Sequence, residues 1–458
     1  MTKLKRNFWQ SISPMKLILG GYCAIILIGT LLLALPAATR GPGGTALSDC
    51  FFTATSATCV TGLVRFDTFT HWTVFGQLVI LALIQIGGLG FMTVAISVMV
   101  IVGKRISLNQ RSLMQNSISA PQLGGIVRMT KFIALGTFVI EVLGALLLSV
   151  VFIPKFGVGK GLYFSLFHSV SAFCNGGFDL MGGSSGEFSS LTGVTGGWGG
   201  AAAWYVTVVI MLLIILGGLG FFVWHDLISR KFHWKKLKLQ SKMVLSISIG
   251  LVLAGTAALL LLEWGHPLYE GLSVGERINA SLFQSVSART AGFNSVDLTG
   301  MTEGGLFVMI CLMFIGGSTG STAGGIKTTT FWILCISIFA TFRRKKNIEV
   351  FGRRMEEGIT RTASCVFMTY LLLTAAVSII ISAIEDLPLL TALFEAVSAM
   401  ATVGLTLGVT PGLGMVSKLL LAFLMLCGRV GSITMLLAFS SDKRVTNSRL
   451  PLEKVQVG

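Results

Sequence analysis

Four short segments of this 458-residue chain resemble one another, and their regular spacing constrains the fold more than any other feature. Each begins with Phe, passes through Ser-Ala and ends in Gly followed by Phe or Leu. The segments are FTATSATCVTGL (52–63), FHSVSAFCNGGF (167–178), FQSVSARTAGF (283–293) and FEAVSAMATVGL (394–405). Their glycines, at 62, 177, 292 and 404, are 115, 115 and 112 residues apart. Repetition at a fixed period indicates like structural units, so we divide the chain into repeats 1–112, 113–232, 233–346 and 347–458.

Apolar stretches flank every segment. Before the segments they cover 15–35, 129–153, 243–264 and 362–384, and after them 72–102, 204–228, 306–341 and 415–439. Each reaches the roughly 20 residues that a helix needs to cross a bilayer. The chain is 53% hydrophobic and only 12% charged, whereas soluble proteins carry about 25% charged residues. We therefore predict an all-α membrane protein with eight transmembrane helices, and with the four short segments as re-entrant pore helices buried by protein.

Basic residues gather in short clusters between the repeats and at both chain ends. The net charge of +16 is typical of nucleic-acid-binding proteins as well, but these clusters alternate with apolar spans. If every repeat crosses the membrane twice, all the clusters fall on one side. The excess of Lys and Arg in cytoplasmic loops then predicts a multi-pass protein of the cell membrane with both termini in the cytoplasm.

Four like units in one chain can surround a pseudo-fourfold axis. Each pore helix would then point its C-terminal end, which carries partial negative charge, toward the membrane centre, and this arrangement favours a cation there. Beyond each helix we predict extended backbone, in the sequences CVTG, CNGG, TAG and ATVG. Rings of backbone carbonyls there can replace the hydration shell of potassium. Glycine suits these positions because it has no side chain to block the path.

The stretches SARTAGFNSVD (287–297) and FEAVSAMATVGLT (394–406) carry a resemblance to a known family. The chain resembles the potassium-translocating subunits of the Trk/Ktr/HKT superfamily along essentially its whole length. The first pore segment comes early, at residue 52, and this favours the KtrB type. The resemblance implies potassium uptake across the bacterial cell membrane through a gated, channel-like pore within the chain. It also implies that two copies of the chain form a homodimer.

The same resemblance assigns one selectivity-filter glycine to each repeat and the coordinating carbonyls to the residues just before it. No repeat carries the full TVGYG of tetrameric channels, so a short filter is expected. The implied filter residues are Val60, Thr61, Gly62, Asn175, Gly176, Gly177, Thr290, Ala291, Gly292, Thr402, Val403 and Gly404.

The stretch GGSTGSTAGGIKTTT (316–330) is a near miss to a nucleotide-binding phosphate loop, because Ile326 stands before Lys327. It interrupts an apolar span and aligns with QIGGLG, ILGGLG and LCGRVG of the other repeats, which disfavours a phosphate loop. A helix kinked for close packing and a broken helix exposed to a pore both remain open. The resemblance implies an intramembrane gate formed by Gly316, Gly317, Ser318, Thr319, Gly320, Ser321, Thr322, Gly324, Gly325, Lys327 and Arg429.

Two further charges lie beside the filter segments. Arg289 and Glu395 are expected to form a structural ion pair, because charges at membrane depth need partners. Two interpretations of Arg429 remain open. It either pairs structurally with helix carbonyls, or it is a fixed positive charge below the filter that hinders cations.

The resemblance also bears on partners and cofactors. It implies a separate cytosolic KtrA-type ring that binds ATP or ADP, with the basic loops 230–242 and 343–361 as candidate docking surfaces. We expect no catalytic residue, no covalently bound cofactor and no metal beyond the transported ion, and sodium activation stays open. Alternating-access transport is an alternative, although parallel repeats disfavour it. A membrane enzyme is a remote alternative, because no acids or histidines converge at matching positions of the repeats.

Overall fold

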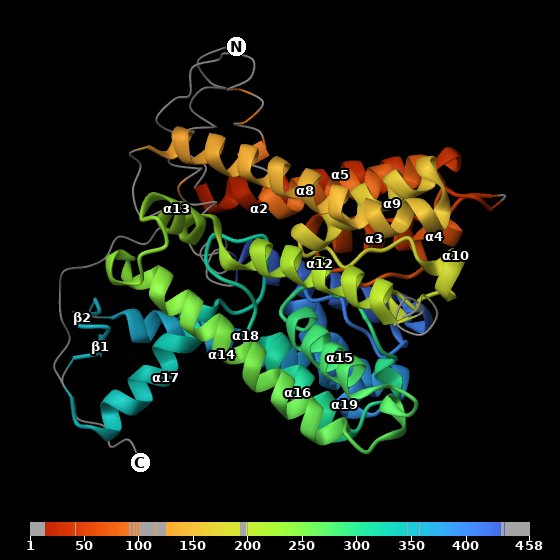
Figure 1. The fold of residues 1–458 in the computed structure, drawn as a ribbon. Coiled ribbons are helices and arrows are strands. Elements are labelled where there is room, and N and C mark those ends of the chain that lie inside the picture. Colours follow the sequence, from red (N-terminus) through yellow and green to blue (C-terminus); the bar gives the residue numbers. More distant parts are fainter. Residues whose placement is uncertain are drawn as a thin grey trace, which may run out of the picture.

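The structure is a computed structural model, and it describes residues 14–41, 43–90, 93, 94, 97, 99, 115, 125–192, 198, 200–345, 347–356, 358–431 and 435. The two chain ends that were predicted to be cytoplasmic lie outside these residues. The described part is mainly helical (Figure 1). It also contains one short antiparallel hairpin, in which β1 (Glu349–Val350) pairs with β2 (Arg353–Arg354) inside a predicted basic loop.

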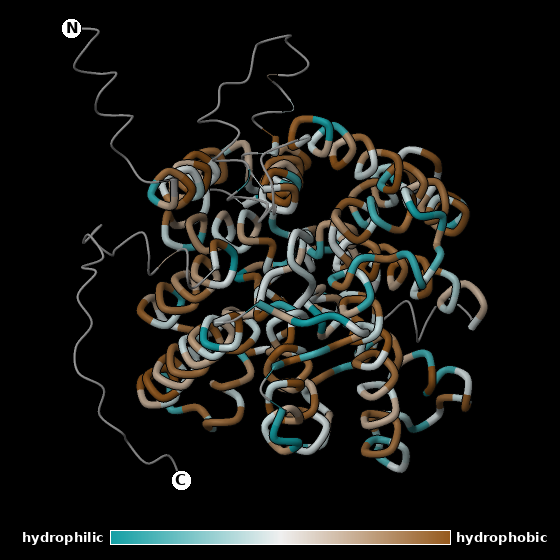
Figure 2. Tube along the Cα trace, turned by 90° about the vertical axis from the view of Figure 1, so that its left-hand side faces the viewer, coloured by the Kyte–Doolittle hydropathy of each residue, from teal (hydrophilic) through white to brown (hydrophobic). Residues whose placement is uncertain are grey.

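Five described helices are long and apolar enough to cross a membrane. They are α2 (Pro14–Leu33), α8 (Ile126–Phe156), α12 (Gly200–Leu219), α14 (Leu239–Glu263) and α18 (Ile359–Glu385). Large apolar side chains on them face outward; on α8, Leu135, Phe138 and Val150 are all about two-thirds exposed. Figure 2 shows hydrophobic residues along the helices and hydrophilic ones mainly in the connecting segments. Such a surface is stable in lipid and would be costly in water.

Four shorter helices follow long ones and pack against them. They are α3 (Leu47–Cys59) on α2, α9 (Val158–Phe173) on α8, α15 (Val274–Ser287) on α14 and α19 (Leu389–Met400) on α18. Their C-terminal halves are almost completely buried and are rich in Ser, Thr and Ala. Small and hydroxyl-bearing side chains allow close helix approach and satisfy polar groups without water. These helices therefore lie inside the protein and away from lipid.

Two further described helices are single turns, α4 (Thr68–His71) and α10 (Gly182–Ser185), and five others come from the apolar stretches that follow the short segments. These five are α5 (Val74–Leu89), α13 (Phe221–Ser229), α16 (Glu303–Phe314), α17 (Thr328–Phe342) and α20 (Met415–Val430). We predicted a continuous span over 204–228, but Gly220 adopts φ 91° and separates α12 from α13. Similarly, α5 ends at Gly90 with φ 79° and α20 at Gly431 with φ 92°. A glycine with positive φ takes the chain out of the helix, so in the described residues α5, α12 and α20 end at these glycines.

Contacts between the helices run in a closed cycle. Helix α5 packs on α9, α12 on α15, α16 on α19, and α20 returns to α3 near the start of the chain. Figure 1 shows α12 running between the α8–α9 pair and the α14–α15 pair. A partly buried ion pair between Lys418 of α20 and Asp49 of α3, at 2.6 Å, stabilises the last contact. The four short helices therefore surround a common centre.

Candidate ion-conducting site

The four glycines of the repeated segments meet at this centre. A methyl group added at Gly177 would lie 3.2 Å from the Cα atoms of both Gly62 and Gly292. One added at Gly292 would lie 3.3 Å from Gly404 Cα, and one added at Gly404 would lie 2.9 Å from Gly62 Cα. Each glycine thus borders the next in the order of the repeats, and the last borders the first. The four backbone segments approach one another so closely that no side chain fits inside this ring, and glycine is therefore needed at each position.

The residue two places before each ring glycine adopts a left-handed backbone. These residues are Val60 (φ 57°), Asn175 (φ 59°), Thr290 (φ 70°) and Thr402 (φ 52°), and the ring glycines themselves have φ between 69° and 97°. Positive φ is rare for β-branched residues, and such conformations cost on the order of 1–3 kcal/mol each. The surroundings must hold this backbone in place, and strain of this kind is concentrated at functional sites.

Hydrogen bonds at the ends of the short helices hold this backbone. The N–H groups of Thr61, Gly176 and Val403 donate back to serine carbonyls one turn earlier, at 2.8, 2.6 and 2.8 Å. This is the pattern that closes a helix with a left-handed residue. The chain then turns toward the ring, and the C-terminal ends of α3, α9, α15 and α19 lie beside it. Their partial negative charge favours a cation over an anion.

A serine in each repeat binds the ring segment from behind, and all four are fully buried. Ser56 and Ser398 accept hydrogen bonds from the N–H groups of Gly62 and Gly404, both at 3.1 Å. The other two donate to the carbonyl after the glycine, Ser171 to Phe178 at 2.7 Å and Ser287 to Phe293 at 2.5 Å. We did not predict this function, although the Ser-Ala pair shared by all four segments was its visible signal.

Polar side chains also hold the irregular segments that follow the ring glycines. His168 Nε2 accepts a hydrogen bond from the Leu180 N–H at 3.3 Å. The fully buried Glu395 accepts from the Leu407 N–H at 3.0 Å, and from the hydroxyls of Thr406 and Thr410 at 2.6 and 2.8 Å. His168 and Glu395 occupy the same place in their segments, directly after the leading Phe. His168 and Glu395 therefore fix the backbone that follows the ring glycine in their repeats.

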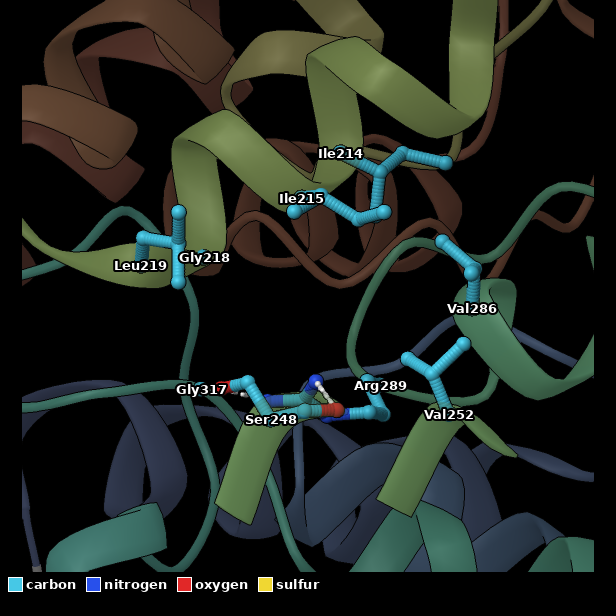
Figure 3. A pocket seen from close by; sticks show the side chains of 9 residues that line it. All are labelled: Ile214, Ile215, Gly218, Leu219, Ser248, Val252, Val286, Arg289 and Gly317. Atoms are coloured by element: carbon cyan, nitrogen blue, oxygen red, sulfur yellow. Dashed lines mark hydrogen bonds between the residues drawn. The ribbon is translucent and has the colours of Figure 1, made fainter. Parts of the chain in front are cut away.

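The predicted ion pair between Arg289 and Glu395 was wrong. The guanidinium of Arg289 donates instead to the backbone oxygen and the hydroxyl of Ser248, at 3.3 and 3.2 Å. Figure 3 shows Arg289 and Ser248 across a small cavity from Ile214 of α12, with Gly317 at its edge. The hydrogen-bond partners of each charge therefore lie in its own repeat, and the two charges do not pair across repeats.

The predicted gate residues from 316 to 327 form the irregular segment between α16 and α17, which we call the central loop (315–327). Backbone hydrogen bonds tie it to the break in the second repeat. The N–H of Ser318 donates to the Gly218 carbonyl at 3.0 Å, and the N–H of Thr322 donates to the Gly217 carbonyl at 3.3 Å. Carbonyls that lack a helical partner at the break between α12 and α13 thus accept hydrogen bonds from the central loop. Backbone groups at membrane depth need such partners because no water is available there.

The central loop lies directly against the fourth ring segment. A methyl group added at Gly324 would overlap the Thr402 hydroxyl and lie 3.0 Å from Thr402 Cβ. Lys327 folds back onto the loop, where its Nζ donates to the Ala323 carbonyl at 2.8 Å. The loop therefore packs against the Thr402 side chain, and position 324 has no room for a side chain of its own.

Arg429, near the end of α20, reaches the central loop from the other side. Its guanidinium donates to the carbonyl of Thr322 and to those of Gly87 and Gly88 at the end of α5, the last at 2.9 Å. The structure thus joins α5, α20 and the loop through one cation, and it brings Arg429 together with the predicted gate segment. The guanidinium therefore lies directly against the central loop, within hydrogen-bonding distance of three backbone carbonyls.

Among the described residues, no group of three or more His, Cys, Asp or Glu side chains could hold a metal ion. Backbone carbonyl oxygens of Thr61, Gly176, Ala291 and Val403 lie beside the ring glycines.

Comparison with known proteins gives a consistent answer. Residues 28–447 match the family model TrkH, described as a cation transport protein. The chain is 40% identical over 466 residues to the potassium/sodium uptake protein NtpJ of Enterococcus hirae, with both chains covered completely. It is 38% identical to the Ktr system potassium uptake protein B of Bacillus subtilis, with 98% of each chain covered.

A solved structure agrees in fold. The potassium transporter TrkH from Vibrio parahaemolyticus matches with a TM-score of 0.69 at 19% identity, over 92% of this chain and 84% of that one. The chain therefore shares its largely helical fold with that transporter. The chain belongs to the TrkH family of cation transport proteins and is a KtrB-type member of the Trk/Ktr superfamily, a transporter and not an enzyme.

Proposed function

We propose that the chain takes up potassium across the bacterial cell membrane through a gated pore. The observation that carries this proposal is the closed ring of four glycines, each bordered by the next. Four tandem helix–pore loop–helix repeats, with eight transmembrane helices and four pore helices around a pseudo-fourfold axis, account for the cyclic helix contacts. Two similar proteins carry potassium uptake in their names.

In this proposal the ring is a selectivity filter. Carbonyl oxygens of the residues that precede the four glycines replace the water around potassium, and the helix ends contribute negative potential. The ring serines and the strained left-handed residues keep the carbonyl rings at the spacing that suits potassium. Because the filter is short, discrimination against sodium depends on a few carbonyl layers.

The central loop and Arg429 act as the gate. The loop lies against the ring, and the guanidinium beside it places a fixed positive charge on the exit path. Conduction then requires the loop and Arg429 to separate, which breaks hydrogen bonds to a charged group. Until that movement takes place, the positive charge of the Arg429 guanidinium repels a potassium ion on the exit path.

A cytosolic partner supplies the energy for this movement. We infer a KtrA-type ring that binds ATP or ADP, because similar proteins are named as parts of a Ktr system. The exposed basic side chains of Lys235, Lys236, Arg353 and Arg354 lie in the two loops proposed as docking surfaces. With the termini in the cytoplasm, these loops face the partner. Homodimer formation and activation by sodium belong to the same proposal.

Potassium uptake in a strain that lacks its own potassium transporters tests the proposal. The wild-type chain is expected to restore growth at low potassium, with sodium competing weakly. Gly292→Ser places a hydroxymethyl group 2.5 Å from the Val403 carbonyl, so it is expected to lower selectivity for potassium over sodium by about tenfold. Equal selectivity in the two proteins, at equal amounts in the membrane, would contradict the filter assignment.

A further inference from the structure

A continuous set of hydrogen bonds connects the gate arginine to the ring. Arg429 donates to the backbone oxygen of Thr322. The hydroxyl of the same Thr322 donates to the side-chain oxygen Oδ1 of Asn175 and to the Phe173 carbonyl, both at 3.1 Å. The Asn175 amide Nδ2 in turn lies 3.4 Å from the Thr290 hydroxyl in the third ring segment. One central-loop residue thus contacts both the gate cation and the filter.

Asn175 is suited to this contact in a way that its counterparts are not. It occupies the left-handed position held by Val60, Thr290 and Thr402 in the other repeats. A carboxamide can accept a hydrogen bond with its oxygen while its nitrogen donates another, whereas the counterparts are shorter and carry no amide. The side chains of Asn175 and Thr322 are at most 1% exposed. Water therefore does not replace their bond when it breaks, and a buried polar group without a partner is costly.

The second repeat leaves room for this bond. A methyl group added at Gly217 of α12 would lie 2.7 Å from Asn175 Oδ1 and 2.9 Å from the Thr322 hydroxyl. The helix can therefore approach the pair closely only because position 217 carries no side chain. The Gly217 carbonyl also accepts the Thr322 N–H at 3.3 Å. Thr322 is consequently held by backbone, by a filter side chain and by the gate arginine at once.

We propose that Asn175 and Thr322 are positioning residues that couple the filter to the gate. The filter holds the central loop in its obstructing position through the Thr322–Asn175 bond, so the loop cannot leave without changing the hydrogen bonding of the second and third filter segments. This inference rests on the proposed function. It adds that a filter residue controls how often the gate opens, and that the other three left-handed positions do not share this function.

A double-mutant cycle on basal potassium uptake tests the coupling, with the purified full-length chain in liposomes and no partner present. Thr322→Val removes only the hydroxyl and keeps the backbone oxygen for Arg429. Asn175→Val removes the amide, and Val60 shows that valine adopts this backbone in the same ring. Each single variant is expected to raise basal uptake about fivefold, as the loss of a typical hydrogen bond predicts. The double variant is expected to raise it by clearly less than the product of the two single effects, because both substitutions remove the shared Thr322–Asn175 bond. Thr322→Val also removes the contact with the Phe173 carbonyl, and Asn175→Val the contact with the Thr290 hydroxyl.

Two further variants separate coupling from general loosening. Thr322→Ser keeps the hydroxyl and is expected to restore wild-type basal uptake. Thr374→Val makes the same substitution at an equally buried threonine of α18, whose hydroxyl bonds only within its helix to Tyr370 at 2.7 Å, and it is expected to leave basal uptake unchanged. If both single variants fold poorly, hydrogen exchange of residues 316–327 in the remaining folded protein provides the readout. It should be faster than in the wild type and in Thr374→Val.

The outcomes are distinct. Multiplying effects in the double variant, unchanged uptake in both single variants, or no rescue by serine would each overturn the coupling while leaving the potassium pore intact. A wild-type chain that transports no potassium would instead contradict the proposed function itself.

Discussion

Replacing Gly404 with alanine is expected to abolish selective potassium uptake. The new methyl group would overlap the Thr61 carbonyl oxygen and lie 2.9 Å from Gly62 Cα, and the backbone φ of 92° strains any L-residue. Overpacking and a left-handed alanine together cost several kcal/mol. The ring can relieve this only by moving carbonyls away from the ion. We expect the initial rate of potassium uptake to fall on the order of a hundredfold, measured at equal amounts of protein in the membrane.

Gly408→Ala is the matched control for this substitution. Gly408 lies four residues farther along the same strand with a similar φ of 80°, but a methyl group there meets only Thr299 Cγ2, at 3.9 Å. It carries the same backbone strain without the clash, so uptake is expected to stay within about twofold of the wild type. Equal losses in the two variants would mean that strain, and not the ring geometry, limits uptake.

Arg429→Ala is expected to raise potassium flux in the absence of any activating partner. The guanidinium holds the central loop and the end of α5 through three carbonyls, and a hydrogen bond to a charged group contributes about 1.5–3 kcal/mol. The substitution also removes the positive charge from the exit path. We therefore expect at least about a tenfold increase in basal flux, measured as potassium-driven uptake into liposomes.

Arg429→Lys separates the charge from the hydrogen bonds. Lysine keeps the positive charge but lacks the planar fork that reaches several carbonyls at once. An intermediate flux, between the wild type and Arg429→Ala, is the expected result. Unchanged or lower flux in Arg429→Ala with normal folding would leave Arg429 as a purely structural residue, which was the other reading of its position.

The spacing of the repeats was sufficient to predict that four glycines meet, because like units in one chain can close around an axis. The backbone beside those glycines was not predictable in the same way. Val60 and Thr402 are poor left-handed residues, and local propensity alone places them in extended strands. Tertiary contacts override that preference, through the helix-end hydrogen bonds and the buried serines.

Charge pairing was the least predictable feature. Arg289 and Glu395 are opposite in sign and lie in neighbouring repeated segments, but the hydrogen-bond partners of each are hydroxyls and backbone groups of its own repeat. Polar side chains that could serve as partners are numerous in a sequence rich in Ser and Thr, so the sequence alone does not show which of them a charge contacts. By contrast, the glycine run at 316–325 indicated a disruption of the apolar span, because successive glycines disfavour a continuous helix. It left a kinked and a broken helix open, and the structure has the broken one, with α16 ending at Phe314 and α17 beginning at Thr328.

Anomalous diffraction from crystals of the purified chain soaked in thallium(I), which substitutes for potassium, tests the central claim most directly. The account predicts a dominant peak inside the ring formed by Gly62, Gly177, Gly292 and Gly404, and this peak should disappear when excess potassium is added. The peak should be surrounded by backbone carbonyls of the residues before those glycines. A peak elsewhere in the protein with none at the ring, or a ring peak that excess potassium does not displace, would contradict the account.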